Sequence, residues 1–231
     1  MSATPEDSSF SSYASDARRE DAAPGARSVL SELESADRLL IQQVFRPIGN
    51  EYRISIPPPG SSEEGRPVLF VKQKKLKIKE DIRFRLSPDA PDHVFMIKSK
   101  SVFEFRGRHE VLDAAGAVIG VLEKSFGRSL IRSHWRVRDA SGAELLEAHE
   151  ASLAIALLRR LAGLLPDWLS LLAWVPFNFV VLREGSEAGR YRRVLGKFRD
   201  RYVFELDPTL ADVDRRLVVA LAVGLDALQD R

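Results

Sequence analysis

Residues 212–228 have the sequence Asp212-Val-Asp-Arg-Arg-Leu-Val-Val-Ala-Leu-Ala-Val-Gly-Leu-Asp-Ala-Leu228, and they decide the fold. The part from Leu217 to Leu225 has no polar side chain, so a helix there offers no face to water and must be buried on every side. The twelve residues from Leu217 to Leu228 would form a helix of roughly 18 Å, whereas the hydrocarbon core of a bilayer is about 30 Å thick. A longer span would include Arg215 and Arg216, at about 3 kcal/mol each. The segment therefore predicts a helix buried inside protein.

The composition favours one domain of a non-secreted protein. The chain has 231 residues, of which 45% are hydrophobic, enough for a single large core. The net charge of only +2 argues against nonspecific binding of nucleic acid through general basic charge. The absence of cysteine excludes disulfides and cysteine-ligated metal, and it fits a cytoplasmic protein. Residues 1–28 are rich in Ser, Asp, Ala and Pro, lack a signal peptide and are predicted to be a disordered tail, followed by one domain over residues 29–231.

Strand patterns dominate the first half of the chain after a short helix predicted within residues 31–44 and an edge strand over residues 52–56. Two later stretches, residues 68–86 and 94–108, alternate between apolar and basic side chains, which predicts one core face and one basic outer face on each. The apolar set is Leu76, Ile78, Ile82, Phe84, Leu86, Phe95, Ile97, Phe103 and Phe105. The basic set is Lys75, Lys77, Lys79, Arg83, Arg85, Lys98, Lys100, Arg106 and Arg108.

Two hairpins follow, marked by a repeated turn sequence. Asp113-Ala-Ala-Gly116 and Asp139-Ala-Ser-Gly142 each stand between strand patterns. An aspartate that opens a turn can bond to its own backbone, and a glycine at the fourth position supplies the positive φ of a bulged type I turn. A strand carrying Trp135 is predicted between the hairpins, over residues 131–137.

The second half contains a helical insertion, predicted over residues 151–176. Leucines at helical spacing in residues 152–165 predict an amphipathic helix that Pro166 ends. Residues 161–182 carry Asp167 as their only charge, but Pro166 and Pro176 favour broken helices packed on protein over a membrane span. Trp168 and Trp174 leave open an insertion into a membrane interface.

Further strands are predicted over residues 177–183, 191–198 and 202–206, with a turn over residues 184–189. Asp212 is the expected N-cap of the C-terminal helix, with Asp214 in its first turn.

The sequence shows no catalytic or metal-binding pattern. The four histidines, His93, His109, His134 and His149, are scattered, and His149-Glu150 lacks the second histidine of a zinc helix. Residues 185–189 and 195–197 fit neither a nucleophile elbow nor a phosphate-binding loop. We therefore predict no enzymatic activity, no cofactor and no metal. Specific nucleic-acid binding is not expected either, because the aromatic and basic side chains of the strands alternate onto opposite faces.

The order of these features resembles the phospholipid scramblase and LURP-one-related family. The resemblance covers residues 48–230 and rests on the hairpin turns, Trp135-Arg-Val-Arg-Asp139, Tyr202-Val-Phe-Glu-Leu-Asp-Pro208 and residues 212–226. It implies a mainly β, tubby-like fold, in which a closed antiparallel barrel of about twelve strands surrounds a buried hydrophobic C-terminal helix. A bacterial member is suggested by the insertion and by the preference for arginine. The calcium-binding segment of the scramblases corresponds to residues 199–205 here, where basic or aromatic residues fill most ligand positions.

Three functions follow as hypotheses. The first is a nonenzymatic domain that associates with anionic phospholipid, peripherally at the inner membrane face. Its expected lipid contacts are Lys75, Lys77, Lys79, Arg83, Arg85, Lys98 and Lys100, with Trp168 and Trp174 as the interfacial residues. The second is a soluble scaffold that binds a protein partner through residues 151–176. The third, lipid scrambling, is implied by the resemblance alone. The basic strand faces could also be solvated and protect strands from pairing between molecules.

Overall fold

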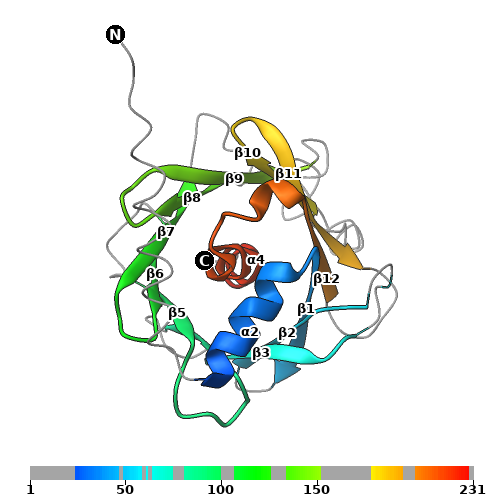
Figure 1. Cartoon of the computed structure of the whole chain (residues 1–231), viewed down its shortest axis with the longest axis vertical. Helices are drawn as coiled ribbons and strands as arrows, with labels where there is room; N and C mark the ends of the chain where they lie inside the picture. Colours follow the sequence, from blue (N-terminus) through cyan, green and yellow to red (C-terminus); the bar gives the residue numbers. More distant parts are fainter. Residues whose placement is uncertain are drawn as a thin grey trace, which may run out of the picture.

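The computed structural model of the chain describes residues 24–46, 49–58, 61, 64–74, 81–99, 107–125, 134–151, 178–194 and 201–228. It is a mainly β protein in which a closed antiparallel barrel of twelve strands surrounds the C-terminal helix, as predicted (Figure 1). The first helix, α2 (Pro24–Ser35), precedes the barrel. The strands are β1 (Arg38–Arg46), β2 (Gly49–Ser55), β3 (Pro67–Lys74), β4 (Ile82–Arg85), β5 (Phe95–Ser99), β6 (Arg108–Asp113), β7 (Val118–Ser125), β8 (His134–Asp139), β9 (Glu144–Glu150), β10 (Asn178–Arg183), β11 (Ser186–Val194) and β12 (Arg201–Leu206). A 3-10 turn, η2 (Pro208–Leu210), leads into α4 (Arg215–Ala227).

Each strand pairs with its neighbours in the chain, and β1 pairs with β12 to close the ring. In the closing pair, Arg38 lies opposite Glu205 and Gln42 opposite Arg201. The expected edge strand over residues 52–56 is instead a fully paired strand, because β2 lies between β1 and β3.

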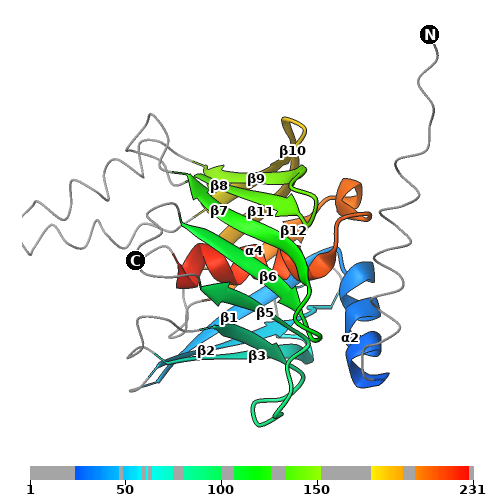
Figure 2. The ribbon, with the colours of Figure 1, turned by 90° about the vertical axis from the view of Figure 1, so that its left-hand side faces the viewer.

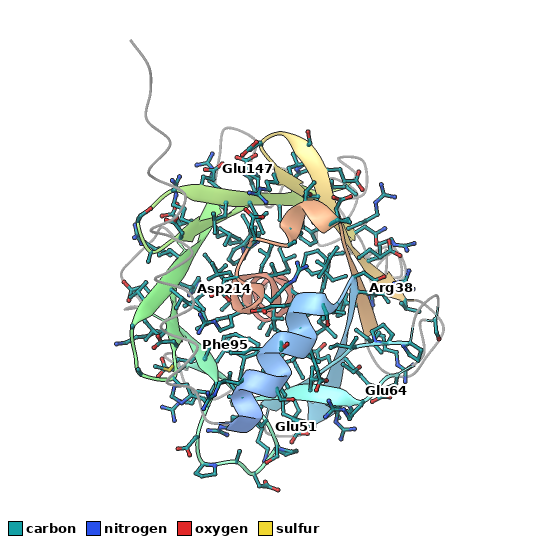
Figure 3. All side chains as sticks on the ribbon, viewed as in Figure 1. Arg38, Glu51, Glu64, Phe95, Glu147 and Asp214 are labelled. Atoms are coloured by element: carbon teal, nitrogen blue, oxygen red, sulfur yellow. The ribbon has the colours of Figure 1, made fainter. Side chains whose placement is uncertain are left out.

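Helix α4 runs along the barrel axis and fills the lumen (Figure 2). Every residue from Arg215 to Leu225 is buried, and the exposed fraction of each hydrophobic or charged residue among them is 5% or less. Side chains from the strands pack around it, among them Phe95, which is fully buried (Figure 3). Gly224 permits a close approach, because a Cβ atom there would lie 3.3 Å from Leu122 Cδ1 of β7. The predicted burial of this helix inside protein is confirmed.

Helix α2 lies across the barrel end at which α4 begins (Figure 2). Five apolar residues of α2 and the following turn join the core: Ala26, Val29, Leu30, Leu33 and Ala36. The prediction of a helix within residues 31–44 was therefore wrong in its position, since α2 begins at Pro24 and residues 38–46 form β1. The helix also includes residues 24–28, which were assigned to the tail.

The two predicted hairpin turns are confirmed. Gly116 and Gly142 have φ angles of 86° and 93°, and each donates its N–H to the carbonyl of the aspartate that opens the turn. The Asp113 and Asp139 carboxylates also accept backbone N–H groups, from Ala117 at 2.8 Å and from Ala143 at 2.9 Å. Local sequence is sufficient for these turns because every stabilising bond lies within five residues.

The third hairpin is tighter than predicted. Only Glu184 and Gly185, with φ angles of 50° and 79°, connect β10 to β11, and residues 186–189 already belong to β11. Positive φ at both positions is the two-residue type I′ geometry, which matches the twist of paired strands. The predicted amphipathic helix and the rest of the insertion, residues 152–176, lie outside the described residues. Within the described residues, no helix has both the length and the apolar character to cross a membrane.

Candidate functional site

The C-terminal end of α4 is fixed to the barrel wall by a carboxylate. Asp226 accepts hydrogen bonds from the hydroxyls of Tyr52 on β2 and Tyr202 on β12, both at 2.8 Å. Gln43 of β1 donates to the Tyr52 hydroxyl at 3.4 Å, and Lys124 of β7 donates to the carbonyl of Leu228 at 3.4 Å. Because these polar groups bind to one another across the helix end, they position α4 rather than present a reactive group.

The N-terminal end of α4 carries the two arginines noted in the sequence, and both are buried. Asp214, not Asp212, is the N-cap, and its carboxylate accepts the N–H of Arg216 and binds the Arg216 guanidinium. Asp212 instead binds Arg183 of β10 through both carboxylate oxygens, which lowers the pKa of Asp212. Burial lowers the pKa of Arg215, whose Nε and Nη1 atoms make no hydrogen bond among the described residues. The expectation that Asp212 caps the helix was therefore wrong, because Arg183 holds that carboxylate.

The outer face of β3, β4 and β5 is the surface for which lipid contact was predicted. Arg83 and Lys98 are exposed and Arg85 is half-buried, whereas Ile82, Phe84, Phe95 and Ile97 face the core, which confirms the predicted alternation for these positions. Phe70 pairs with Arg85 and Val71 with Phe84, and the exposed Lys72, which follows Val71, forms an ion pair with Asp89 at 3.1 Å. Lys75, Lys77, Lys79 and Lys100 lie outside the described residues, as do Trp168 and Trp174.

The outer face of β6 to β9 differs, because its arginines are matched by glutamates. Arg138 lies 3.1 Å from Glu123 and 3.3 Å from Glu144, and Arg136 lies 3.5 Å from Glu147. Glu147 is labelled in Figure 3. On β4, by contrast, the nearest carboxylate to Arg83 is that of Asp81 at 3.9 Å, and Arg85 and Lys98 form no ion pair within the described part of the chain. The basic charge of β4 and β5 is thus less compensated than that of β6 to β9.

His93 lies in the connection from β4 to β5, where the nearby arginines of β4 affect its pKa. Burial lowers the pKa of His93 below its ordinary value of 6.5, and Arg83 and Arg85 lower it further, while Asp92 and Asp81 oppose the shift. The Nε2 atom of His93 is buried without a hydrogen bond among the described residues, which also disfavours the charged ring.

We expect His93 to make the fold less stable in acid. Since its pKa is lower in the folded than in the unfolded chain, the neutral ring stabilises the fold above the ordinary value of 6.5, and this contribution is lost as the pH falls through the folded pKa. Urea unfolding of wild type and His93→Asn at a series of pH values measures the effect. The variant should lose less stability on acidification. Identical pH profiles, or an NMR titration that finds the pKa of His93 above its ordinary value, would contradict this assignment.

Sequence reasoning did not find the hydrogen bonds of Asp226 with Tyr52 and Tyr202 that hold the end of α4. It also did not find the ion pairs between arginines and glutamates on β6 to β9. Asp226 was noted only as part of a family motif, and no periodicity marks its two tyrosine partners, which lie 174 and 24 residues away in the chain. Within the described residues, no three His, Asp or Glu side chains are grouped as metal ligands.

Comparison with known proteins gave one match to a family model and one to a solved structure. Residues 68–226 match the LURP-one-related family. Among solved structures, an X-ray structure of a protein from Arabidopsis thaliana matches with 15% sequence identity and a TM-score of 0.32, covering 88% of this chain and 98% of that one. A search of curated proteins found no match. The link to scramblases and the bacterial origin stay predictions. Because the family match extends over most of the barrel and includes α4 to Asp226, the chain belongs to the LURP-one-related family.

Proposed function

We propose that this protein is a nonenzymatic domain that associates with anionic phospholipid through the outer face of β3, β4 and β5 and the neighbouring connections. The observation that carries the proposal is the weakly compensated charge of Arg83, Arg85 and Lys98, of which Arg83 lies 3.9 Å from Asp81, in contrast to the more closely paired arginines of β6 to β9. A lysine or arginine near an anionic membrane contributes about 1 kcal/mol, and it does so most effectively when no carboxylate of the protein already binds it.

The other predicted contacts belong to segments that join described strands at one end of the barrel. Lys75, Lys77 and Lys79 lie between β3 and β4, Lys100 lies between β5 and β6, and Trp168 and Trp174 lie between β9 and β10. All three connections run from an odd-numbered to an even-numbered strand, and in an antiparallel barrel of sequential neighbours such connections share one end. The described strand ends that flank these predicted contacts therefore share one end of the barrel.

The absence of an enzymatic role is part of the proposal and fits the family, whose members are generally nonenzymatic. Since α4 and its packed neighbours fill the lumen, the described barrel acts through its outer surface and its ends. Attachment would be peripheral, from the cytoplasmic side. Lipid scrambling is a separate activity, which transfer of fluorescent lipid in proteoliposomes would detect.

Cosedimentation with vesicles tests the proposal. Wild-type protein should pellet with vesicles of phosphatidylcholine mixed with phosphatidylserine, should remain in solution with phosphatidylcholine alone, and should be released by added salt. Combining Arg83→Gln with Lys98→Gln should weaken binding by at least about tenfold, since each lost charge removes about 1 kcal/mol. A matched control combines Arg190→Gln with Arg192→Gln, two exposed arginines of β11 on the other side of the barrel, and leaves the net charge equal to that of the first variant.

The control should bind like wild type within about twofold, because its two cations lie away from the proposed surface. If wild type does not bind anionic vesicles, or if both double variants lose affinity equally, the proposal fails. A scaffold that binds a protein through residues 151–176 would be revealed by a different result. In that case vesicle binding would be absent, and light scattering of the protein with a partner would change on deletion of those residues.

A further inference from the structure

Three basic side chains lie close together on the outer face of the barrel, where β4 leads into β5. Arg83 and Arg85 are the outward residues of β4, in which they alternate with buried residues. Val94 donates its N–H to the carbonyl of Phe84 at 2.7 Å. In an antiparallel pair, the residue before one bonded position lies beside the residue after the other, so His93 is the neighbour of Arg85.

The donors of this cluster are not fully used. The Nε atom of Arg85 and the Nε2 atom of His93 are buried without a hydrogen bond in the described part of the chain. Among those residues, Arg83 has Asp81 as its ion-pair partner at 3.9 Å, and neither Arg85 nor His93 forms an ion pair. Both side chains are partly exposed, so a ligand can reach the cluster from solvent. A bound acceptor would recover part of the free energy that is lost when donors leave water unpaired.

The cluster carries an excess of positive charge. Burial lowers the pKa of His93, and Arg83 and Arg85 lower it further. Asp92 and Asp81 are the carboxylates that act on the ring, and they raise its pKa by less than the arginines lower it. Two neighbouring arginines, with an imidazole that becomes charged beside an anion, match a ligand with two negative charges better than a ligand with one.

We infer that Arg83, Arg85 and His93 form a binding site for a dianionic phosphate group, and that His93 takes up a proton when this ligand binds. The inference rests on the proposed function and deepens it by naming the chemistry of the headgroup. A terminal phosphate carries a charge of about −1.5 to −2 at pH 7, and a guanidinium can donate two hydrogen bonds to it. Phosphatidic acid presents such a group on a membrane, and inorganic phosphate presents it in solution.

Lys98 belongs to the same basic face but not to this cluster. It is exposed on β5, four residues beyond Val94, or about 13 Å along the strand. The residue opposite Lys98 across the sheet is Glu110 of β6. Replacing Lys98 therefore removes one positive charge from the face without removing a member of the proposed site.

Vesicles with different headgroups test the chemistry of the site. Phosphatidylcholine vesicles receive either phosphatidic acid or phosphatidylserine, in amounts that give the same zeta potential, and cosedimentation of the full-length chain measures Kd. Wild type should bind the vesicles with phosphatidic acid at least about tenfold more tightly, because only a terminal phosphate can occupy all three basic groups.

Single substitutions identify the residues that cause this preference. Arg85→Gln should abolish it, and so should Arg83→Gln, whose side chain is 48% exposed and can be replaced without disturbing the core. Lys98→Gln is the matched control, which loses the same charge and should weaken binding to both kinds of vesicle equally. Circular dichroism during heating shows whether each variant is folded.

The pH dependence of binding tests the role of His93. A ligand that raises the pKa of a group binds more tightly as the pH falls, because protons are taken up with it. The affinity of wild type for phosphatidic acid, divided by that of His93→Asn, should therefore rise at least about threefold between pH 8 and pH 6.5. The phosphate itself titrates near pH 6, but it does so alike for both proteins. In solution, millimolar inorganic phosphate should raise the pKa of His93 in an NMR titration, whereas chloride at equal ionic strength should not.

The outcomes distinguish this site from lipid association in general. Failure of wild type to bind either anionic vesicle contradicts the proposed function itself. Equal affinity for both headgroups, without an effect of inorganic phosphate on His93, overturns the phosphate site and leaves lipid association standing. Equal affinity with a clear effect of inorganic phosphate supports the site and overturns membrane lipid as its source. A pH dependence that His93→Asn does not change overturns the uptake of a proton by His93.

Discussion

Replacing Gly120 with valine is expected to lower the free energy of unfolding by about 3–5 kcal/mol, at the upper end of the effects seen when a packed core is overfilled. Gly120 lies on β7 against the first turns of α4. A Cβ atom there would lie 2.5 Å from the Arg138 carbonyl oxygen and 2.7 Å from Leu217 Cδ2. The carbonyl belongs to the paired strand β8 and cannot rotate away, so either the sheet or the central helix must shift.

Gly224→Ala is the matched control, because the same helix meets the wall there with more room. Its new Cβ would lie 3.3 Å from Leu122 Cδ1, the end of a flexible side chain. Alanine also favours a helix over glycine by about 1 kcal/mol, which offsets the tighter contact. Urea unfolding followed by circular dichroism compares both variants with wild type. A Gly120→Val protein as stable as wild type would show that β7 and α4 do not approach as closely as described.

The second large effect is expected for Asp226→Ala, which should lower the free energy of unfolding by about 2–4 kcal/mol, since it leaves two tyrosine hydroxyls without their acceptor. Tyr52 and Tyr202 are 1% and 4% exposed, so water cannot easily replace the carboxylate. The loss arises from donors that lack a partner. Adding Tyr52→Phe and Tyr202→Phe should therefore restore part of the stability.

Thermal and urea unfolding of the single, triple and wild-type proteins measure this recovery. Asp89→Ala serves as a control for the loss of one negative charge, because that side chain is 93% exposed and should change stability by less than about 0.5 kcal/mol. If Asp226→Ala unfolds like Asp89→Ala, the carboxylate does not hold the end of α4. If the triple variant is less stable than the single one, the tyrosine hydroxyls make other hydrogen bonds that contribute more to stability than those with Asp226.

Much of the fold could be predicted because its signals are local. The apolar run from Leu217 to Leu225 required burial whatever surrounded it, and the turns at Asp113 and Asp139 are stabilised within their own few residues. Ring closure and the number of strands came from family resemblance. Closure depends on the pairing of β1 with β12, which no short segment encodes.

The errors have physical causes. Strand β1 does not alternate visibly, because Leu40 and Gln42 on its outer side are as buried as Leu39 and Ile41 on its inner side, so its leucines matched a helical pattern. The basic faces were predicted correctly for Arg83 and Lys98, but the extent of their neutralisation was not. Whether an arginine meets a glutamate depends on the register of the neighbouring strand, as for Arg138 and Glu123 across β7 and β8.

The pairing of β1 with β12 also determines when the barrel can close during synthesis of the chain. Residues 38–42 must wait for residues 201–205 before the ring can close, and the helix that fills it is made later still. A ribosome adds about 5–20 residues per second, and contacts between such distant parts of a chain form slowly. Until α4 has been made, we therefore expect the apolar inner face of the strands to lack the helix that covers it in the folded protein.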